Sequence, residues 1–299
     1  MKPLTFAIAL ACFAPLAQAA TPFDETRAIS PDAEISLDNL KGQIEVTTWE
    51  RNEIRIHGRR GEGTKELAIT GDAAHLSIKI EYPENKGWFL WGGDEAEASD
   101  LRVTVPAGVS VNVDTVAAQV QVRGVAGREL SIESVSGRVD AQTGAAEVAI
   151  ETVSGDATIQ AQSRELTVES VSGDIRVRGA LAERVELEAV SGSIELDSSG
   201  SAKHVAAGVV SGDVTLRTGL QSGARLTAES LSGDVEVILP ANSSAAIAAS
   251  SFTGTIKSDQ GEVETEEHGP GSSLSLTLGR GDARVDLETF SGDLRLRLE

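Results

Sequence analysis

Apolar and polar residues alternate along most of this chain, and short glycine-containing segments interrupt the alternation. The clearest example runs from Glu169 to Arg178, E-S-V-S-G-D-I-R-V-R, where a Val-Ser-Gly segment separates two alternating runs. Successive side chains of a β-strand point to opposite faces, so a period of two predicts short strands. Glycine between two such runs predicts a tight turn. The pattern therefore predicts an all-β chain.

Close copies of this segment recur from Glu133 to Glu299. Successive turn glycines are 18, 18, 19, 20, 21, 21 and 38 residues apart, and the spacing predicts an earlier, degenerate turn near Ala117 and Ala118. Repetition at a nearly fixed period is typical of solenoids, whose units bury their apolar faces only by stacking. We predict a single-chain parallel β-solenoid (β-helix) over residues 34–299, with rungs of about 18–21 residues. The predicted turn glycines are Gly137, Gly155, Gly173, Gly192, Gly212, Gly233, Gly254 and Gly292.

The repeat also predicts which side chains form the core. In one unit Leu166 and Val168 point inward, while Thr167 and Glu169 point outward. The position just before each Ser-Gly (or Thr-Gly) pair is apolar in every copy, and this regularity predicts a second inward-facing column. Its members are Val135, Val153, Val171, Val190, Val210, Leu231, Phe252 and Phe290.

The two ends of the repeat carry further expectations. The last run, L-R-L-R-L-E, is expected to be an open sheet edge that Arg295 and Arg297 protect from edge-to-edge pairing. The step of 38 residues is either two rungs of 19 or one rung with an insertion, and the favoured interpretation is an acidic insertion at 259–271. At the other end, strands are expected at 66–70, 75–82, 101–105 and 109–115, continuing the same stack. Asn39 to Gly42 occupies the turn position of a degenerate first rung, and residues 20–33 form an extended leader.

Residues 83–100 break the alternation and predict a projecting loop. This segment contains Trp88, Phe89 and Trp91 in a chain with only 3% aromatic residues. Aromatic side chains on a loop commonly anchor a partner, so these three are the candidate partner-binding residues. The alternative is that the loop folds back and caps the end of the solenoid.

The N-terminus resembles a secretory signal peptide over residues 1–19. Lys2 precedes an apolar run from Leu4 to Leu16, and Ala17-Gln18-Ala19 provides a small-residue cleavage site. The only cysteine, Cys12, lies inside this run, and the sequence before it is a poor lipoprotein signal. Export to the periplasm or to the bacterial cell surface is therefore expected, with no disulfide and no transmembrane segment in the mature chain.

Charge and composition restrict the partners and the chemistry. The net charge of −20 argues against binding nucleic acid, which needs clustered Lys and Arg. Abundant small aliphatic residues suit a thin solenoid core. The four histidines are scattered without metal-ligand spacing, and no nucleophile elbow or phosphate-binding loop occurs. We expect no enzyme activity and no cofactor.

Two acidic columns follow from the repeat. One consists of the aspartates after the turn glycine, and the other runs through Glu133, Glu151, Glu169, Glu188, Glu229 and Glu288. Stacked carboxylates could attract Ca²⁺, which needs six to eight oxygen ligands. However, Arg138, Ser193 and Thr255 interrupt the aspartate column. The favoured interpretation of both columns is a solvated face.

The repeated V-S-G-D turns in an exported, β-rich chain resemble the bacterial putative-adhesin domain family of unknown function. The V-P-A-G segment at 105–108 and the L-P pair at 239–240 contribute to this resemblance, which covers roughly residues 34–299. It implies an envelope or surface protein and offers no catalytic residues to transfer. We expect a non-catalytic binding or structural role with an envelope protein or a polysaccharide as partner. The alternative is an enzyme or binding protein that acts on envelope polysaccharide.

Overall fold

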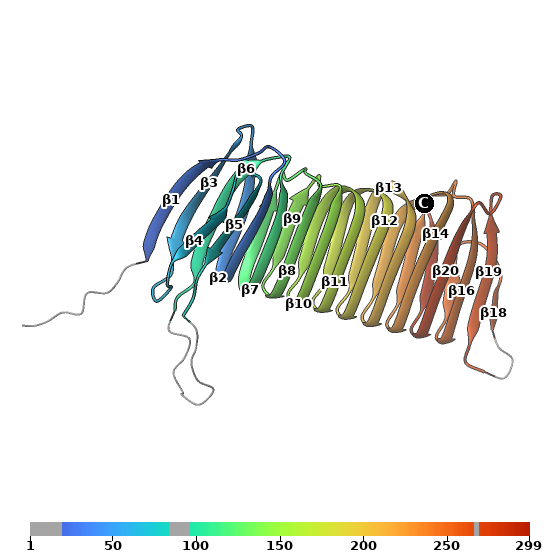
Figure 1. Ribbon diagram of the computed structural model, residues 1–299. Helices are drawn as coiled ribbons and strands as arrows, with labels where there is room; N and C mark the ends of the chain where they lie inside the picture. The colour runs from blue at the N-terminus through green and yellow to red at the C-terminus, as the bar shows by residue number, and fades with distance from the viewer. Residues whose placement is uncertain (1–19, 84–95, 266–268) are drawn as a thin grey trace, which may run out of the picture.

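The computed structural model describes residues 20–83, 96–265 and 269–299 and confirms the predicted all-β solenoid. Two sheets of mainly parallel strands lie face to face and run the length of an elongated slab (Figure 1). Each rung contributes one strand to each sheet. The strands that precede the Ser-Gly turns form the first sheet, and those that follow the turns form the second.

The middle of the stack is the most regular part. Successive rungs pair in parallel, for example Val148 with Leu166 and Leu166 with Val185, so each strand lies beside its own copy. The longest strands serve both sheets because the chain stays extended as it passes from the second sheet into the first. The strands of this region are β8 (Glu129–Ser136), β9 (Val139–Thr143), β10 (Glu147–Ser154), β11 (Ala157–Ser172), β12 (Ile175–Ser191), β13 (Ile194–Ser211), β14 (Val214–Ser232) and β15 (Val235–Leu239).

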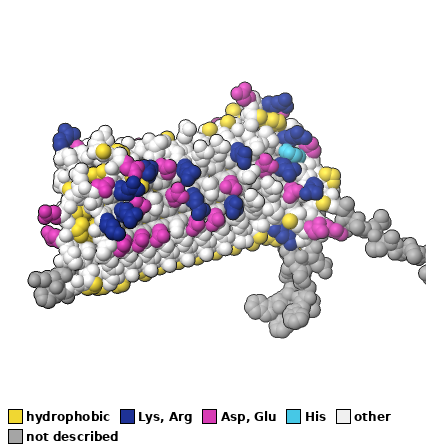
Figure 2. All heavy atoms as spheres, turned by 180° about the vertical axis from the view of Figure 1, so that it is seen from behind, with side chains coloured by type: hydrophobic (Ala, Val, Ile, Leu, Met, Phe, Trp, Pro, Cys, Tyr) yellow, Lys and Arg dark blue, Asp and Glu magenta, His cyan; other side chains and the backbone are white. Residues whose placement is uncertain are grey.

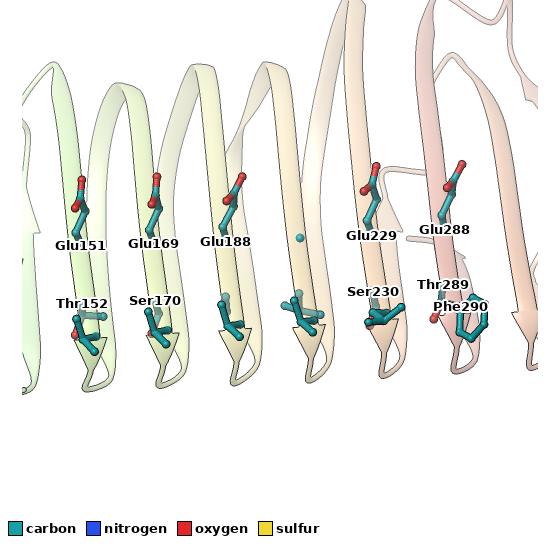
Figure 3. A pocket seen from close by; sticks show the side chains of 18 of the residues that line it. Glu151, Thr152, Glu169, Ser170, Glu188, Glu229, Ser230, Glu288, Thr289 and Phe290 are labelled. Carbon is teal, nitrogen blue, oxygen red and sulfur yellow. The ribbon is translucent and has the colours of Figure 1, made fainter. Parts of the chain in front are cut away.

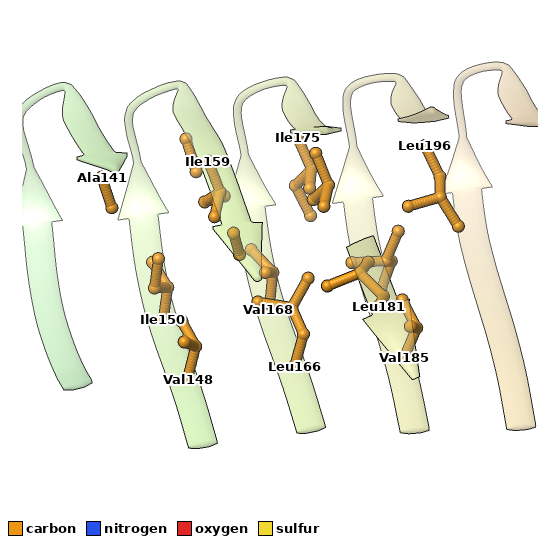
Figure 4. Close-up of a cluster of buried hydrophobic side chains, with 14 of the residues drawn as sticks. Ala141, Val148, Ile150, Ile159, Leu166, Val168, Ile175, Leu181, Val185 and Leu196 are labelled. Atoms are coloured by element: carbon orange, nitrogen blue, oxygen red, sulfur yellow. The ribbon is translucent and has the colours of Figure 1, made fainter. Parts of the chain in front are cut away.

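The core is a single thin layer between the two sheets. Leu166 and Val168 of the first sheet are fully buried, as are Ile175 and Val177 of the second. Stacked columns of Val, Ile, Leu and Ala continue through the slab, as Figure 4 shows for its middle rungs. Burying apolar area contributes roughly 25 cal/mol per Å², so the stacked columns stabilise rungs that could not fold singly.

The predicted glycines lie at the bend between the two strands of each rung. Gly212 shows why this position excludes a side chain. Its φ is +143°, and a Cβ atom there would lie 2.1 Å from the carbonyl oxygen of Gly192 in the neighbouring rung. Glycine therefore permits both the backbone conformation and the close approach of the rungs.

The C-terminal rung is not at the end of the stack, which corrects the expectation of an open edge there. Val285 pairs with Leu226 on one side and with Ile247 on the other, so the last rung is inserted between two earlier ones. Arg295 and Arg297 likewise belong to a strand with neighbours on both sides. The strands concerned are β16 (Ala245–Thr253), β17 (Ile256–Ser258), β20 (Ala283–Ser291) and β21 (Leu294–Leu298).

An antiparallel pair of strands covers the far end of the first sheet instead. β19 (Ser272–Leu278) pairs antiparallel with β16 and with β18 (Val263–Thr265), which lies within the segment predicted as an acidic insertion. The chain thus reaches the far end of the stack first. Its last strands, β20 and β21, then lie between two rungs that come earlier in the sequence.

The N-terminal strands continue the stack, as predicted, and at this end too the terminal rung lies between two others. Leu37 pairs with Val113 on one side and Ile78 on the other, so the first rung also lies inside the stack. Antiparallel strands β1, β3 and β4 flank this end, and β1 lies in the segment predicted as a leader. The strands are β1 (Thr21–Ala28), β2 (Glu34–Trp49), β3 (Glu53–Arg60), β4 (Leu67–Gly71), β5 (His75–Ile80), β6 (Ser99–Pro106) and β7 (Ser110–Arg123).

Candidate functional site

The apolar column before each turn faces solvent, which corrects the prediction that it forms part of the core. Its members are between 43% and 56% exposed. In stack order they are Val116, Val135, Val153, Val171, Val190, Val210, Leu231, Phe290 and Phe252. We call these nine residues the apolar ladder.

The reason is the period of two itself. Leu166, Val168 and Ser170 are buried, and Val171 comes one residue later, so it must point to the opposite face. The inward position beside the turn is taken by a small residue instead. Ser251 and Thr289 occupy this inward position in two of the rungs. The buried hydroxyl of each donates a hydrogen bond to the carbonyl oxygen of a turn glycine, at 3.0 and 3.2 Å. The apolar character of the ladder therefore serves something other than the core.

A column of carboxylates runs beside the apolar ladder on the same outer face. It lies two residues earlier in each strand, and its members in stack order are Asp38, Asp114, Glu133, Glu151, Glu169, Glu188, Glu229 and Glu288. Gly208 occupies the same position between Glu188 and Glu229. We call these eight residues the acidic column.

The six glutamates of the acidic column make no hydrogen bond or ion pair with any residue that the structure describes. Like charges about 4.8 Å apart repel by about 1 kcal/mol in water, and none of these six glutamates has a basic partner among the described residues to offset that repulsion. Nearer the N-terminal end, burial together with the charges of Glu133 and Asp38 raises the pKa of Asp114. Asp38 itself pairs with Lys79.

Elsewhere on the slab, carboxylates are interleaved with basic side chains. Arg164 pairs with Glu147 at 2.7 Å, and on the second sheet Arg178 pairs with Glu195 at 3.2 Å. Figure 2, which views the molecule from behind Figure 1, shows Lys and Arg mixed with Asp and Glu on that face. The uncompensated charge of the six glutamates is thus a local feature of the surface beside the apolar ladder.

The apolar ladder and the acidic column together line a shallow open groove of about 1190 Å³ on the first sheet. Figure 3 shows the glutamate side chains in a row above the turn-proximal side chains. At one end of the apolar ladder, Phe252 and Phe290 stack with ring centroids 4.8 Å apart and planes 11° from parallel. The groove therefore combines a continuous apolar stripe with a parallel row of negative charge.

The turn aspartates have a structural role, which explains why Asp recurs after the turn glycine in several rungs. Asp174 Oδ1 accepts a hydrogen bond from the backbone N–H of Ser193 in the next rung, at 3.0 Å. Asp293 accepts one from the N–H of Thr255 at 2.9 Å. These backbone hydrogen bonds hold the pKa of both carboxyls below the ordinary value of 3.8. Within residues 20–83, 96–265 and 269–299, no group of three or more His, Cys, Asp or Glu side chains is arranged to hold a metal ion.

The other predicted site residues fall into two groups. The eight glycines line the turns and carry no chemistry. Trp88, Phe89 and Trp91 lie outside the described residues, so their role as partner-binding residues stays a prediction. The sequence signal for the outward apolar ladder is the offset of three between the buried Val168 and Val171 in a strand of period two.

The fold resembles several solved structures at low sequence identity. A putative adhesin from Bacteroides fragilis is 13% identical, with a TM-score of 0.44, 92% of this chain covered and 97% of that one. For a putative adhesin from Parabacteroides merdae the identity is 10% and the TM-score 0.48, with 92% and 96% covered. A putative lipid binding protein from Parabacteroides distasonis is 12% identical, with a TM-score of 0.48 and the same coverage.

Three further findings concern membrane-spanning helices, curated relatives and the domain family. In the part of the chain that the structure describes, no helix has the length and hydropathy to cross a membrane. No curated protein matches the sequence. The sequence does match one domain family from residue 33 to residue 297, which is most of the described chain. This chain belongs to the Toastrack DUF4097 family.

Proposed function

We propose that this chain is a non-catalytic binding protein of the bacterial cell envelope, exported to the periplasm or the cell surface, and that it binds a protein partner in the groove of the first sheet. The observation that carries the proposal is the apolar ladder. Nine neighbouring apolar side chains stay about half exposed in a single stripe, and an exposed stripe of this kind is typical of an interaction surface.

The surroundings of the apolar ladder support a binding role. The first and second sheets share one rigid stack, so the groove is formed before the partner arrives and little ordering is needed on binding. The N-terminal segment that resembles a signal peptide supports export. Polysaccharide cleavage is the competing function, since a row of carboxylates also suits acid–base chemistry.

The test compares retention of envelope proteins by the wild-type chain and by a triple variant, Val153→Thr with Val171→Thr and Val190→Thr. Threonine keeps the β-branched shape that strands favour and removes apolar surface from the apolar ladder. A matched control, Thr158→Ala with Gln160→Ala, changes exposed positions of β11 on the second sheet. We expect the wild type and the control to retain the same protein and the triple variant to lose it.

Two results would contradict the proposal. Equal retention by all three proteins would remove the apolar ladder as the binding surface. Cleavage of envelope polysaccharide that Glu169→Gln abolishes would replace binding with catalysis.

A further inference from the structure

The groove presents side chains only, and this restricts the form of whatever binds there. Each strand that lines the middle of the groove already pairs on both sides, as β10 does with β8 and β11. A bound polypeptide therefore cannot extend the sheet. Over the apolar ladder its backbone would also lose water, and an unpaired backbone polar group away from water is costly. An α-helix solves this problem because it satisfies its own backbone hydrogen bonds.

The dimensions of the groove suit a single helix. Nine members of the apolar ladder at about 4.8 Å per rung span about 38 Å. A helix of about 25 residues has this length at 1.5 Å per residue. The apolar ladder is one side chain wide in each rung, so it matches the narrow apolar stripe of an amphipathic helix rather than a broad apolar sheet.

The acidic column beside the apolar ladder restricts which side chains the bound helix can carry on its flank. Glu133, Glu151, Glu169 and Glu188 form an unbroken run of carboxylates without basic partners. Lys or Arg side chains along one flank of a bound helix would offset their mutual repulsion and pair with them. A second copy of this chain, with its net charge of −20, would increase that repulsion, and so would an anionic membrane surface.

We propose that the groove binds a cationic amphipathic α-helix of the partner protein, with the apolar stripe of the helix on the apolar ladder and its Lys or Arg flank along the acidic column. This inference rests on the proposed function and specifies the chemistry of the partner. The helix lies along the stack and crosses the strands, so its apolar side chains contact many rungs in succession.

The experiment measures binding of a fluorescent helical peptide of about 25 residues, built from Leu, Ala and Lys with the leucines in one stripe, by anisotropy. Two control peptides carry the same composition in scrambled order, or Glu in place of every Lys. The protein variants are Glu151→Gln with Glu169→Gln and Glu188→Gln, and the Val→Thr triple variant described above. A control for charge on the second sheet is Asp140→Asn with Asp197→Asn.

We expect the wild type and the second-sheet control to bind the striped cationic peptide with equal affinity. Both triple variants should bind it at least about tenfold more weakly, because each removes one of the two features that the peptide contacts. Added salt should weaken binding to the wild type, since the charges are exposed. The scrambled peptide and the acidic peptide should bind much more weakly.

Several results would overturn the inference. These are equal affinity for the striped and scrambled peptides, no effect of the Glu→Gln triple variant, and binding of phosphatidylcholine vesicles in place of the peptide. Self-association that the Glu→Gln variant strengthens would point to a second copy as the occupant. If the peptide fails to bind while the Val→Thr variant still loses the envelope protein, the helix inference fails and the proposed function stands.

Discussion

The turn aspartates connect neighbouring rungs at the scale of single atoms. Each supplies a carboxylate oxygen to a backbone N–H that the turn would otherwise leave without a strand partner, as Asp174 does for Ser193. A charged acceptor makes a stronger hydrogen bond than a neutral one. Asp174 also pairs with Arg176 at 2.7 Å. The carboxylate therefore stabilises the stack from a position that looks, in the sequence, like an ordinary turn residue.

This role predicts a pH-dependent effect of Asp174→Asn. Hydrogen bonding lowers the pKa of Asp174 in the folded chain, so its charge stabilises the fold above the ordinary value of 3.8, and that contribution disappears as the pH falls through the lower folded value. The variant should lose up to about 1 kcal/mol of unfolding free energy near neutral pH and much less in acid. Urea unfolding at both pH values measures this.

Asp140→Asn provides the control for this experiment, because Asp140 lies on the outer face of the second sheet without an ion pair among the described residues. It should change the unfolding free energy little at either pH. A loss from Asp174→Asn that is the same in acid and at neutral pH would contradict the assigned role.

Residue by residue, the sequence predicts the inward positions well and fails at one column. Leu166, Val168, Ile175 and Val177 are buried as the alternation requires. The prediction is wrong for Val171, because its apolar character suggests burial while its position along the strand places it on the outer face. A rule based on burial alone cannot anticipate an apolar residue at an outward position.

At the scale of the rung, the turn is the least tolerant part. A Cβ atom at Gly212 would lie 2.1 Å from a backbone oxygen, and backbone cannot move aside as a flexible side chain can. Gly208 offers a matched control in the preceding strand, since a Cβ atom there would meet nothing within 4 Å. The two glycines have the same chemistry but very different surroundings.

Gly212→Ala should therefore destabilise the chain by at least about 2 kcal/mol, through strain and separation of two rungs. Gly208→Ala should change stability by no more than about 0.5 kcal/mol. Urea unfolding of both variants measures the difference. Similar unfolding midpoints for the two would show that the rungs do not approach as closely as described.

The strands of each rung can be predicted because one repeat contains every sequence feature that specifies them. The period of two, the Ser-Gly turn and the spacing of 18–21 residues are local properties of the sequence. The outward side of Val171 follows from the same period of two, but the extent of the groove does not. It arises only when outward side chains from many rungs, far apart in sequence, stack into columns on one face.

At the scale of the whole molecule, both terminal rungs lie inside the stack. Antiparallel strands flank both ends of the first sheet, while the first rung, in β2, and the last rung, in β20 and β21, each lie between two other rungs. The sequence could not reveal this order, because the steps from Gly212 to Gly233 and from Gly233 to Gly254 are equal and predict direct stacking of those three turns. In the structure the turns of Gly233 and Gly254 do not stack directly, because the last rung pairs with the strands on either side and lies between them.

Cysteine pairs test this rung order directly, in a Cys12→Ser background. Glu229 pairs with Glu288, whereas Ser250 lies on the far side of Glu288. Neighbouring strands lie about 4.8 Å apart, which suits a disulfide, and next-nearest strands at about 10 Å do not. The pair Glu229→Cys and Glu288→Cys should cross-link on oxidation, as measured by the loss of free thiols.

The control pair, Glu229→Cys and Ser250→Cys, should keep both thiols free under the same conditions. Cross-linking of the control pair in place of the first would mean that the rungs stack in sequence order and that the C-terminal rung lies at the end.

The central claim is that an apolar ladder faces solvent along the slab and is free to bind a partner. It is tested most directly by thiol labelling of Val171→Cys and, as reference, Val168→Cys, both in the Cys12→Ser background. Val171 is 49% exposed and Val168 is fully buried. The native Val171→Cys protein should react at least about ten times faster, because a buried thiol is inert. Protection of Val171→Cys to the level of Val168→Cys would place the apolar ladder in the core and contradict the account.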